Sequence, residues 1–363
     1  MDSYPSICSV QAVFPPNYYS QELLTAQLRE RYWQGSEQRI ARFEQLHRHV
    51  CVQGRHLALP IQDYPRLEGF QGRNDAWIEV ATALGEEALR CLFEQAGVNA
   101  DEVALLTTTT VTGIAVPTLD ARLMNRLPFS AGLKRMPLFG LGCLGGVAGL
   151  ARVADYLAGH PDEVAVLLAV ELCSLTIQPD DLSIANIIAT ALFGDGAAAV
   201  LLAGAGHPLA AAPAPQIVAS RSLFFPETER VMGWDVTSSG FQVVLSADVP
   251  EIARTEIGPA VDAFLDEHGL RRGDIGSWVA HPGGPKVIEA LEEGLALAPG
   301  TLHLSRESLT RVGNLSSVSV LHVLQETLRE SHATGSYSLM LAMGPAFAAE
   351  LILLRWAGPH EPN

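Results

Sequence analysis

Residues 139–157, FGLGCLGGVAGLARVADYL, place a glycine-rich turn directly before a run of Gly, Ala and Leu with helical spacing. The helix is followed, after a polar link, by the apolar stretch EVAVLLAVELC at 163–173. The same order returns later in the chain. Residues 311–328, RVGNLSSVSVLHVLQETL, lead through a polar link into SYSLMLAMGP at 336–345. Turn, helix, link and buried strand therefore occur twice.

Aligning the two stretches places Gly142 on Gly313 and Cys143 on Asn314, an offset of 171 residues. Such a repeat indicates an internal duplication, in which equivalent strand-to-helix turns face each other across one core. Runs such as VAVLLAV suit strands buried on both faces. The Gly- and Ala-rich helix after Cys143 suits a helix packed between two sheets. We therefore predict an α/β protein with a duplicated five-layered α/β/α/β/α fold.

The seam between the two halves is predicted in AGAGHPLAAAPAPQ at 203–216, which is rich in Ala, Pro and Gly. Residues 1–215 would form an N-terminal half that carries the nucleophilic cysteine. Residues 216–363 would form a C-terminal half that carries the histidine and the asparagine described below.

Composition bounds the class of protein. The chain of 363 residues is 48% hydrophobic and 18% charged, as expected of a packed globular protein. Its net charge of −16 argues against non-specific nucleic-acid binding, which needs a basic face. The first residues do not resemble a signal peptide, and the longest apolar run, 164–175, is interrupted by Glu171 and too short to span a bilayer. The five cysteines have no metal-like spacing. We expect a cytoplasmic protein with reduced thiols and no membrane span.

Three residues at strand ends or helix starts can carry chemistry. Cys143 precedes a helix whose first amides would stabilise a thiolate and lower its pKa, although a small buried core cysteine is the alternative. His281, in WVAHPGGP, ends a buried strand. It can orient a thiolate or donate to an oxyanion, or it is a satisfied structural histidine. Asn314 can donate from its amide to a thioester carbonyl, or it is a helix N-cap.

Together, the three side chains match the needs of a decarboxylating condensation. The cysteine can carry an acyl group as a thioester. Histidine and asparagine offer two neutral donors to the thioester oxygen of a malonyl group, which gains enolate charge as CO2 leaves. The resulting carbanion can attack the acyl group held on the cysteine. The pattern therefore predicts an enzyme that forms carbon–carbon bonds.

The motifs GCLGG, ALFGDGAAAV, WVAHPGGPKVIEAL, GNLSS and MGPAF resemble, in order and spacing, those of chalcone synthase-like type III polyketide synthases, over residues 5–356. FGDGAAA alone is similar to the wider thiolase-like superfamily, so the resemblance implies a thiolase-like fold. It also implies a catalytic triad of Cys143, His281 and Asn314. No metal or redox cofactor is implied, because the substrates are CoA thioesters, namely an acyl-CoA starter and malonyl-CoA. A homodimer is implied as well.

The resemblance also assigns residues that contact substrate. Phe193 matches the gatekeeper between the CoA tunnel and the cavity, with simple core packing as the alternative. Val116 matches a position that reaches into the partner's cavity across the homodimer. The other positions placed around the substrate are Thr176, Ser316, Trp234, Val243, Gly283 and Arg42.

Departures from the plant members point to a bacterial-type member. Val243 stands where phenylalanine is common, and Trp234 stands where glycine is frequent, which implies a differently shaped cavity. Arg42 and His49 fall near the cations that meet the CoA phosphates, while Gln45 replaces one of them. The implied product is an alkylpyrone, a resorcinol or a related phenolic ring. We favour a fatty or medium-length acyl starter over malonyl-CoA alone.

Three other interpretations are open. A ketoacyl synthase III-like enzyme that initiates fatty-acid synthesis uses the same residue types, but it has glutamine where this chain has Pro282. A cysteine-dependent thioester hydrolase needs G-x-C-x-G, in which Leu141 replaces the first glycine, and it gives no role to Asn314. A non-catalytic binding protein that keeps the fold would not need the complete triad.

Overall fold

The computed structural model describes residues 4–32 and 36–358, which are built around one nine-stranded sheet in the order β11-β12-β13-β8-β1-β7-β6-β4-β5. The strands are β1 (Ser6–Val13), β2 (Asn17–Ser20), β3 (Gly54–Leu57), β4 (Val103–Thr110), β5 (Lys134–Phe139), β6 (Val164–Leu172), β7 (Asp195–Ala203), β8 (Pro215–Phe224), β9 (Met232–Thr237), β10 (Gly240–Leu245), β11 (Ile275–Ala280), β12 (Tyr337–Gly344) and β13 (Ala348–Trp356). The α-helices are α1 (Gln21–Tyr32), α2 (Glu37–His49), α3 (Gly69–Ala96), α4 (Leu119–Leu123), α5 (Gly145–Gly159), α6 (Ile184–Leu192), α7 (Val249–Asp266), α8 (Pro285–Gly294), α9 (His303–Val312) and α10 (Ser317–Thr327).

The duplication is visible in the strand order. Reading outward from the centre, β1-β7-β6-β4 in one half corresponds to β8-β13-β12-β11 in the other, and β5 extends the first half. In each half the strand after the central helix pairs in parallel with an earlier strand of the same half: β6 with β4, and β12 with β11. The remaining pairs of the two series are antiparallel. Between β1 and β8 the register contains a single pair, Ser6 with Gln216, so the sheet bends there into two layers.

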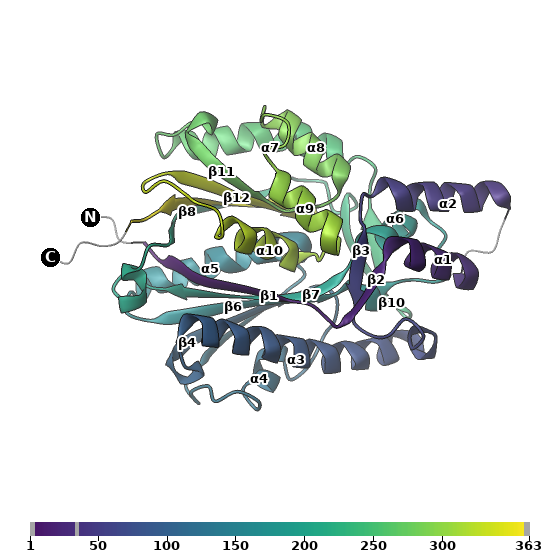
Figure 1. Cartoon of the computed structure of the whole chain (residues 1–363), viewed down its shortest axis with the longest axis horizontal. Helices are drawn as coiled ribbons and strands as arrows, with labels where there is room; N and C mark the ends of the chain where they lie inside the picture. The colour runs from purple at the N-terminus through teal and green to yellow at the C-terminus, as the bar shows by residue number, and fades with distance from the viewer. Residues whose placement is uncertain (1–3, 33–35, 359–363) are drawn as a thin grey trace.

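Helices cover both faces of each half-sheet (Figure 1). The long α3 lies on the outer face of the first half, α7 and α8 lie on the outer face of the second, and α5 and α10 lie between the two (Figure 1). The predicted five-layered α/β/α/β/α arrangement is confirmed. Every residue of β6 and β7 is buried, as their continuous apolar sequences require.

Small residues set the distance between the two central helices. A methyl group on Gly146 of α5 would lie 2.4 Å from the carbonyl oxygen of Ser317 and 2.8 Å from Cγ1 of Val320, both on α10. A methyl group on Gly149 would lie 2.6 Å from Leu167 of β6. Contacts this close need glycine, because overpacking forces helices apart. The close approach brings together the two turns that precede α5 and α10.

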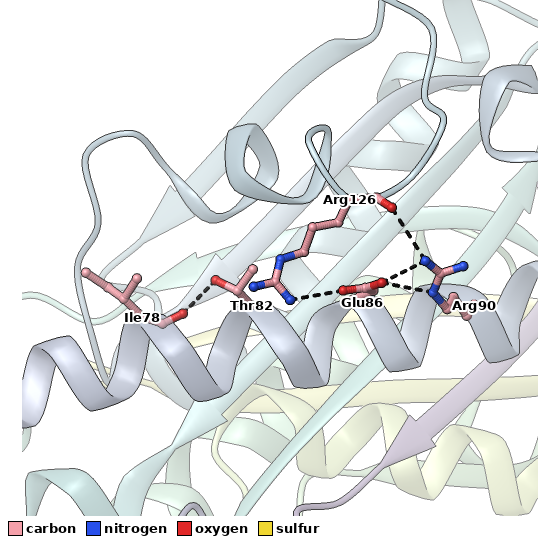
Figure 2. A network of polar contacts seen from close by, with 5 residues as sticks. All are labelled: Ile78, Thr82, Glu86, Arg90 and Arg126. Atoms are coloured by element: carbon pink, nitrogen blue, oxygen red, sulfur yellow. Dashed lines mark hydrogen bonds and ion pairs between the residues drawn. The ribbon is translucent and has the colours of Figure 1, made fainter.

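Polar contacts tie the outer helix α3 to the loop after α4 (Figure 2). Glu86 accepts hydrogen bonds from Arg90 at 2.7 Å and from Arg126 at 3.1 Å. These two arginines hold the pKa of the Glu86 carboxyl below its usual value. Thr82 bonds back to the carbonyl of Ile78, one turn earlier, at 2.6 Å. Ion pairs as exposed as these contribute little stability, so their effect is to position the loop.

No helix in the described ranges combines the length and the apolar character that crossing a bilayer requires.

Candidate active site

A cavity of about 460 Å³ opens beside the turns that precede α5 and α10. Its wall contains Cys143, His281 and Asn314, which the sequence places far apart. Six of the residues predicted to contact substrate line the same cavity: Phe193, Ser316, Trp234, Val243, Gly283 and Arg42. The volume lies within the usual range for small-molecule sites.

Cys143 lies in a single 3-10 turn, Gly142–Leu144, immediately before α5. Gly140 and Gly142 have φ angles of +87° and +52°, which explains the glycines around the cysteine. The thiol donates to Oγ of Ser316 at 3.7 Å. The sulfur lies on the wall of the cavity, within reach of a bound molecule.

The expected low pKa of Cys143 is wrong. Burial raises the pKa of the thiol to about 12, and the hydrogen bond with Ser316 offsets only part of that effect. The negative charge of Glu171 raises the pKa further. Burying a thiolate costs more free energy than hydrogen bonds from the nearby donors recover. The Cys143 side chain is therefore a neutral thiol near pH 7.

His281 follows β11 and is 2% exposed. Its backbone N–H donates to the carbonyl of Leu341 on β12 at 2.9 Å, which fixes its position. Neither ring nitrogen has a hydrogen-bond partner in the described part of the chain. Burial lowers the pKa of the imidazole to about 3, so the ring is neutral near pH 7. A neutral imidazole can donate one N–H and accept one proton.

The amide of Asn314 has two different environments. Its Oδ1 accepts the backbone N–H of Ser316 at 2.8 Å, which shapes the turn before α10. Its Nδ2 donates to the carbonyl of Gly283 at 3.4 Å, a long contact, and carries a second N–H. The oxygen thus has the structural role expected of a residue near a helix start, while the nitrogen is available to a ligand. Ser316 has φ +51°, a strained value for a residue with a side chain.

Phe193 is joined to Asn314 through the backbone. Asn314 N–H donates to the carbonyl of Leu192 at 2.8 Å, and Gly194 N–H donates to the carbonyl of Asn314 at 2.9 Å. The Phe193 ring lies 6.2 Å from the ring of Trp234, measured between centroids. Phe193 and Asn314 are therefore held on two turns that backbone hydrogen bonds join.

A second cavity of only about 10 Å³ lies behind Phe193, Trp234 and Val243, which contribute to the walls of both spaces. Trp234 and Val243 are opposite each other in the β9–β10 hairpin. Thr176 lines the small cavity. Thr176 was predicted to lie with the other substrate-contacting residues around one chamber, whereas Trp234 stands at the boundary between two cavities.

Val116 is 93% exposed, and it does not line either of these cavities within this chain. Arg42 and His49 of α2 lie on the wall of the main cavity, and Lys286 of α8 joins them. Lys286 was missed by the sequence analysis. Its position directly after HPGGP was the available signal.

Glu171 was also missed. It is fully buried at the end of β6 and accepts hydrogen bonds from Ser317 at 2.6 Å, from Thr112 at 2.9 Å and from the backbone N–H of Val111 at 3.1 Å. Burial raises the pKa of this carboxyl to about 7 despite these donors. A lone acidic residue inside an otherwise apolar strand was the signal that sequence reasoning could have used. Within residues 4–32 and 36–358, no group of three or more His, Cys, Asp or Glu side chains could hold a metal ion.

The fold and the cavity define a class. Two repeated halves enclose two central helices, and the turns before those helices bring a cysteine and an asparagine to one cavity. This is the architecture of the thiolase-like condensing enzymes.

The chain belongs to the chalcone and stilbene synthase family: the N-terminal domain of that family matches residues 6–207 and the C-terminal domain matches residues 216–357. It is a type III polyketide synthase, a decarboxylating and condensing acyltransferase. It is 47% identical over 357 residues to a 1,3,6,8-tetrahydroxynaphthalene synthase of Streptomyces peucetius subsp. caesius, covering 98% of this chain and 94% of the relative. It is 28% identical over 354 residues to a phloroglucinol synthase of Pseudomonas fluorescens, covering 97% of this chain and 99% of the relative.

The fold matches solved structures as well. The 1,3,6,8-tetrahydroxynaphthalene synthase of Streptomyces coelicolor A3(2), a bacterial type III polyketide synthase, superimposes with a TM-score of 0.91 at 28% identity, covering 97% of this chain and 99% of that one. A polyketide synthase of the brown alga Ectocarpus siliculosus superimposes with a TM-score of 0.90 at 26% identity, covering 98% and 99%. The predicted thiolase-like fold is confirmed, and a hydrolase of α/β-hydrolase type is excluded.

Proposed function

We propose that Cys143 carries the acyl chain and that His281 and Asn314 promote decarboxylation of malonyl-CoA. The observation that carries the proposal is the meeting of these three side chains, from three distant segments, on the wall of one cavity of about 460 Å³. Phe193 would close that cavity toward the smaller one, and Ser316 would hold the sulfur through its hydrogen bond.

Loading begins with a neutral pair, because the thiol has a raised pKa and the imidazole a lowered one. We infer that His281 removes the proton from Cys143 while the sulfur attacks the acyl-CoA carbonyl, and not in a separate earlier step. The bond between the carbonyl carbon and the CoA sulfur then breaks. The proton returns to the leaving CoA thiolate, and an acyl thioester remains on Cys143.

Extension uses the same cavity. The thioester oxygen of malonyl-CoA would accept an N–H from His281 and an N–H from Nδ2 of Asn314. When CO2 leaves, its bonding electrons pass to that oxygen as an enolate, which the two neutral donors stabilise. The enolate carbon attacks the acyl carbonyl on Cys143, and the carbon–sulfur bond breaks. The Cys143 thiolate takes a proton from solvent, and the lengthened chain, now on CoA, can return to the cysteine.

We propose malonyl-CoA as both starter and extender, with a polyhydroxylated aromatic product, in place of the fatty or medium-length starter favoured on sequence alone. The synthase that is 47% identical makes 1,3,6,8-tetrahydroxynaphthalene. The ten ring carbons of that product, oxygenated at alternate positions, correspond to two-carbon units from malonyl groups. The cavity of about 10 Å³ behind Trp234 leaves no room for a long alkyl tail on that side, which supports a short starter.

Further proposals concern the two halves, the assembly of the enzyme, its cofactors and its contacts with CoA. Residues 1–215 and 216–363 would act as the two halves, since the family's two domains match on either side of residue 215. The enzyme would work in the cytoplasm as a homodimer, with the exposed Val116 reaching the partner's cavity. It would need CoA thioesters as substrates and no separate cofactor. Arg42, His49 and Lys286 would meet the CoA phosphates.

The test incubates the protein with malonyl-CoA and follows three signals: CO2 release, the mass of the intact protein, and the mass of the products. The wild type and the matched control Cys91→Ala, on α3 away from the cavity, should gain an acyl mass and form product. Cys143→Ala should gain none. Asn314→Ala should still be acylated, but its CO2 release should fall about 10²- to 10³-fold, as for loss of one oxyanion donor. Acylation of Cys143→Ala, or a wild type that releases no CO2, would contradict the proposal.

A further inference from the structure

Arg55 links the two turns on which the proposed chemistry depends. It lies on β3, is 2% exposed, and is among the largest fully buried side chains of the protein. One guanidinium nitrogen, Nη1, donates to the carbonyl of Thr190 at 2.7 Å and to the carbonyl of Phe193 at 2.8 Å. Both carbonyls belong to the C-terminal end of α6, where no further helical turn can use them. The guanidinium therefore caps α6 and fixes the backbone of the gatekeeper.

The aliphatic part of Arg55 packs against the turn that carries Asn314. A methyl group on Gly313 would lie 3.0 Å from Cγ of Arg55, and one on Gly194 would lie 3.5 Å from its Cβ. Gly313 has φ +76° and immediately precedes Asn314. One side chain therefore contacts Phe193 and the residue before Asn314, on the two sides of the Phe193–Asn314 backbone bridge.

The charge of Arg55 is also held in place. Burial lowers the pKa of its guanidinium to about 10, while the carboxylate of Asp195 opposes that effect, so the group stays protonated near pH 7. Asp195 follows Gly194 and accepts hydrogen bonds from the backbone N–H groups of Ala58, at 2.5 Å, and Ser174, at 2.8 Å. Two carbonyls therefore hold the guanidinium, and the nearby carboxylate of Asp195 favours its charged form.

We propose that Arg55 is a positioning residue for the decarboxylation step, which sets the location of the Asn314 amide and the Phe193 ring relative to each other. The inference rests on the proposed roles of Asn314 and Phe193. Cys143 lies on a separate turn, before α5, and no hydrogen bond joins that turn to Arg55 in the described residues. Loss of Arg55 should therefore disturb decarboxylation more than loading of the cysteine.

The experiment compares two rates in the full-length protein. The first is acylation of Cys143 by acyl-CoA, followed by intact mass, and the second is CO2 release from malonyl-CoA. Arg55→Met keeps the length of the side chain and removes the charge and the donors. Its CO2 release should fall between ~10-fold and ~100-fold, the cost of a displacement of about 1 Å, while acylation stays within about threefold. Arg55→Lys keeps a positive charge but has one ammonium group in place of the planar guanidinium. Its rate of CO2 release should fall less than that of Arg55→Met.

The matched control is Arg31→Met on α1, an exposed arginine that lines the same small pocket as Arg55 and bonds weakly to the carbonyl of Ile61. It should change neither rate. If Arg55→Met does not fold, Arg55→Lys is judged by the same ratio of rates. Equal changes in both rates, including no change, would overturn the role of Arg55. A wild type that neither loads nor releases CO2 would instead overturn the proposed function, so the two failures are distinguishable.

Discussion

Replacing Glu171 with glutamine should change how the stability of the protein depends on pH. The carboxyl is fully buried beside Ser317, Thr112 and Val111, and burial raises its pKa from 4.5 to about 7. Glutamine has nearly the shape of the protonated acid and keeps a carbonyl oxygen to accept hydrogen bonds, but it does not titrate. The two proteins therefore differ mainly in one ionisation.

The direction of this pH dependence follows from the number of protons that the folded and unfolded chains bind. Between pH 4.5 and about pH 7 the folded wild type holds a proton on Glu171 that the unfolded chain has lost. Its stability therefore falls as pH rises through this window, by about 1.4 kcal/mol per pH unit. The full difference amounts to about 3 kcal/mol, which is present below pH 4.5 and lost above pH 7. Other buried groups such as Asp195 and His281 titrate in both proteins and cancel in the comparison.

The assay is urea unfolding of the wild type and Glu171→Gln at a series of pH values from 4.5 to 8, at one protein concentration, because association would make stability depend on concentration. The free energy of unfolding of the variant, minus that of the wild type, should rise by about 3 kcal/mol across the series. Cys143 supplies an independent signal: removing the Glu171 charge should lower the pKa of its thiol. Iodoacetamide should then react faster with Cys143 in the variant at pH 8.

Two outcomes would refute this reasoning. A free-energy difference that is constant with pH would mean that Glu171 titrates alike in the folded and unfolded chains. Slower alkylation of Cys143 in the variant would mean that the carboxylate does not act on the thiol through its charge.

Two further predictions concern packing. Gly146→Ala should lower the free energy of unfolding by about 1–3 kcal/mol, because the new methyl group would lie 2.4 Å from the carbonyl oxygen of Ser317. The control Gly159→Ala, at the other end of α5 with open space around it, should be neutral or slightly stabilising. Equal urea midpoints for the two variants would argue against a close α5–α10 contact. Trp234→Gly should join the two cavities that share this residue, and so shift the products toward longer chains or larger starters. The measurement is mass spectrometry of the products formed from a panel of acyl-CoA starters. An unchanged product profile would show that the indole does not limit chain length.

Much of the architecture could be predicted because its signals are local or repeated. The match of Gly142 with Gly313 and of Cys143 with Asn314 indicated two equivalent turns, and the structure has equivalent helices after both. The fully buried β6 and β7 could be predicted from continuous apolar runs, since a strand covered on both faces needs no polar alternation. The motifs around Cys143, His281 and Asn314 also predicted the family, which is confirmed.

The sequence by itself determined the order of the elements, the family and the three segments that meet at the cavity, because these depend on residue type and spacing along the chain. Only the tertiary structure decided the direction of the Cys143 pKa, the separation of Thr176 from the main cavity, and the contacts of Glu171 and Arg55. The physical reason is that desolvation and packing sum over neighbours from many distant segments. A helix start predicts a stabilised thiolate, but the side chains that shift the pKa of Cys143 come from distant segments: Glu171 from β6, and Asn314 and Ser316 from the turn before α10.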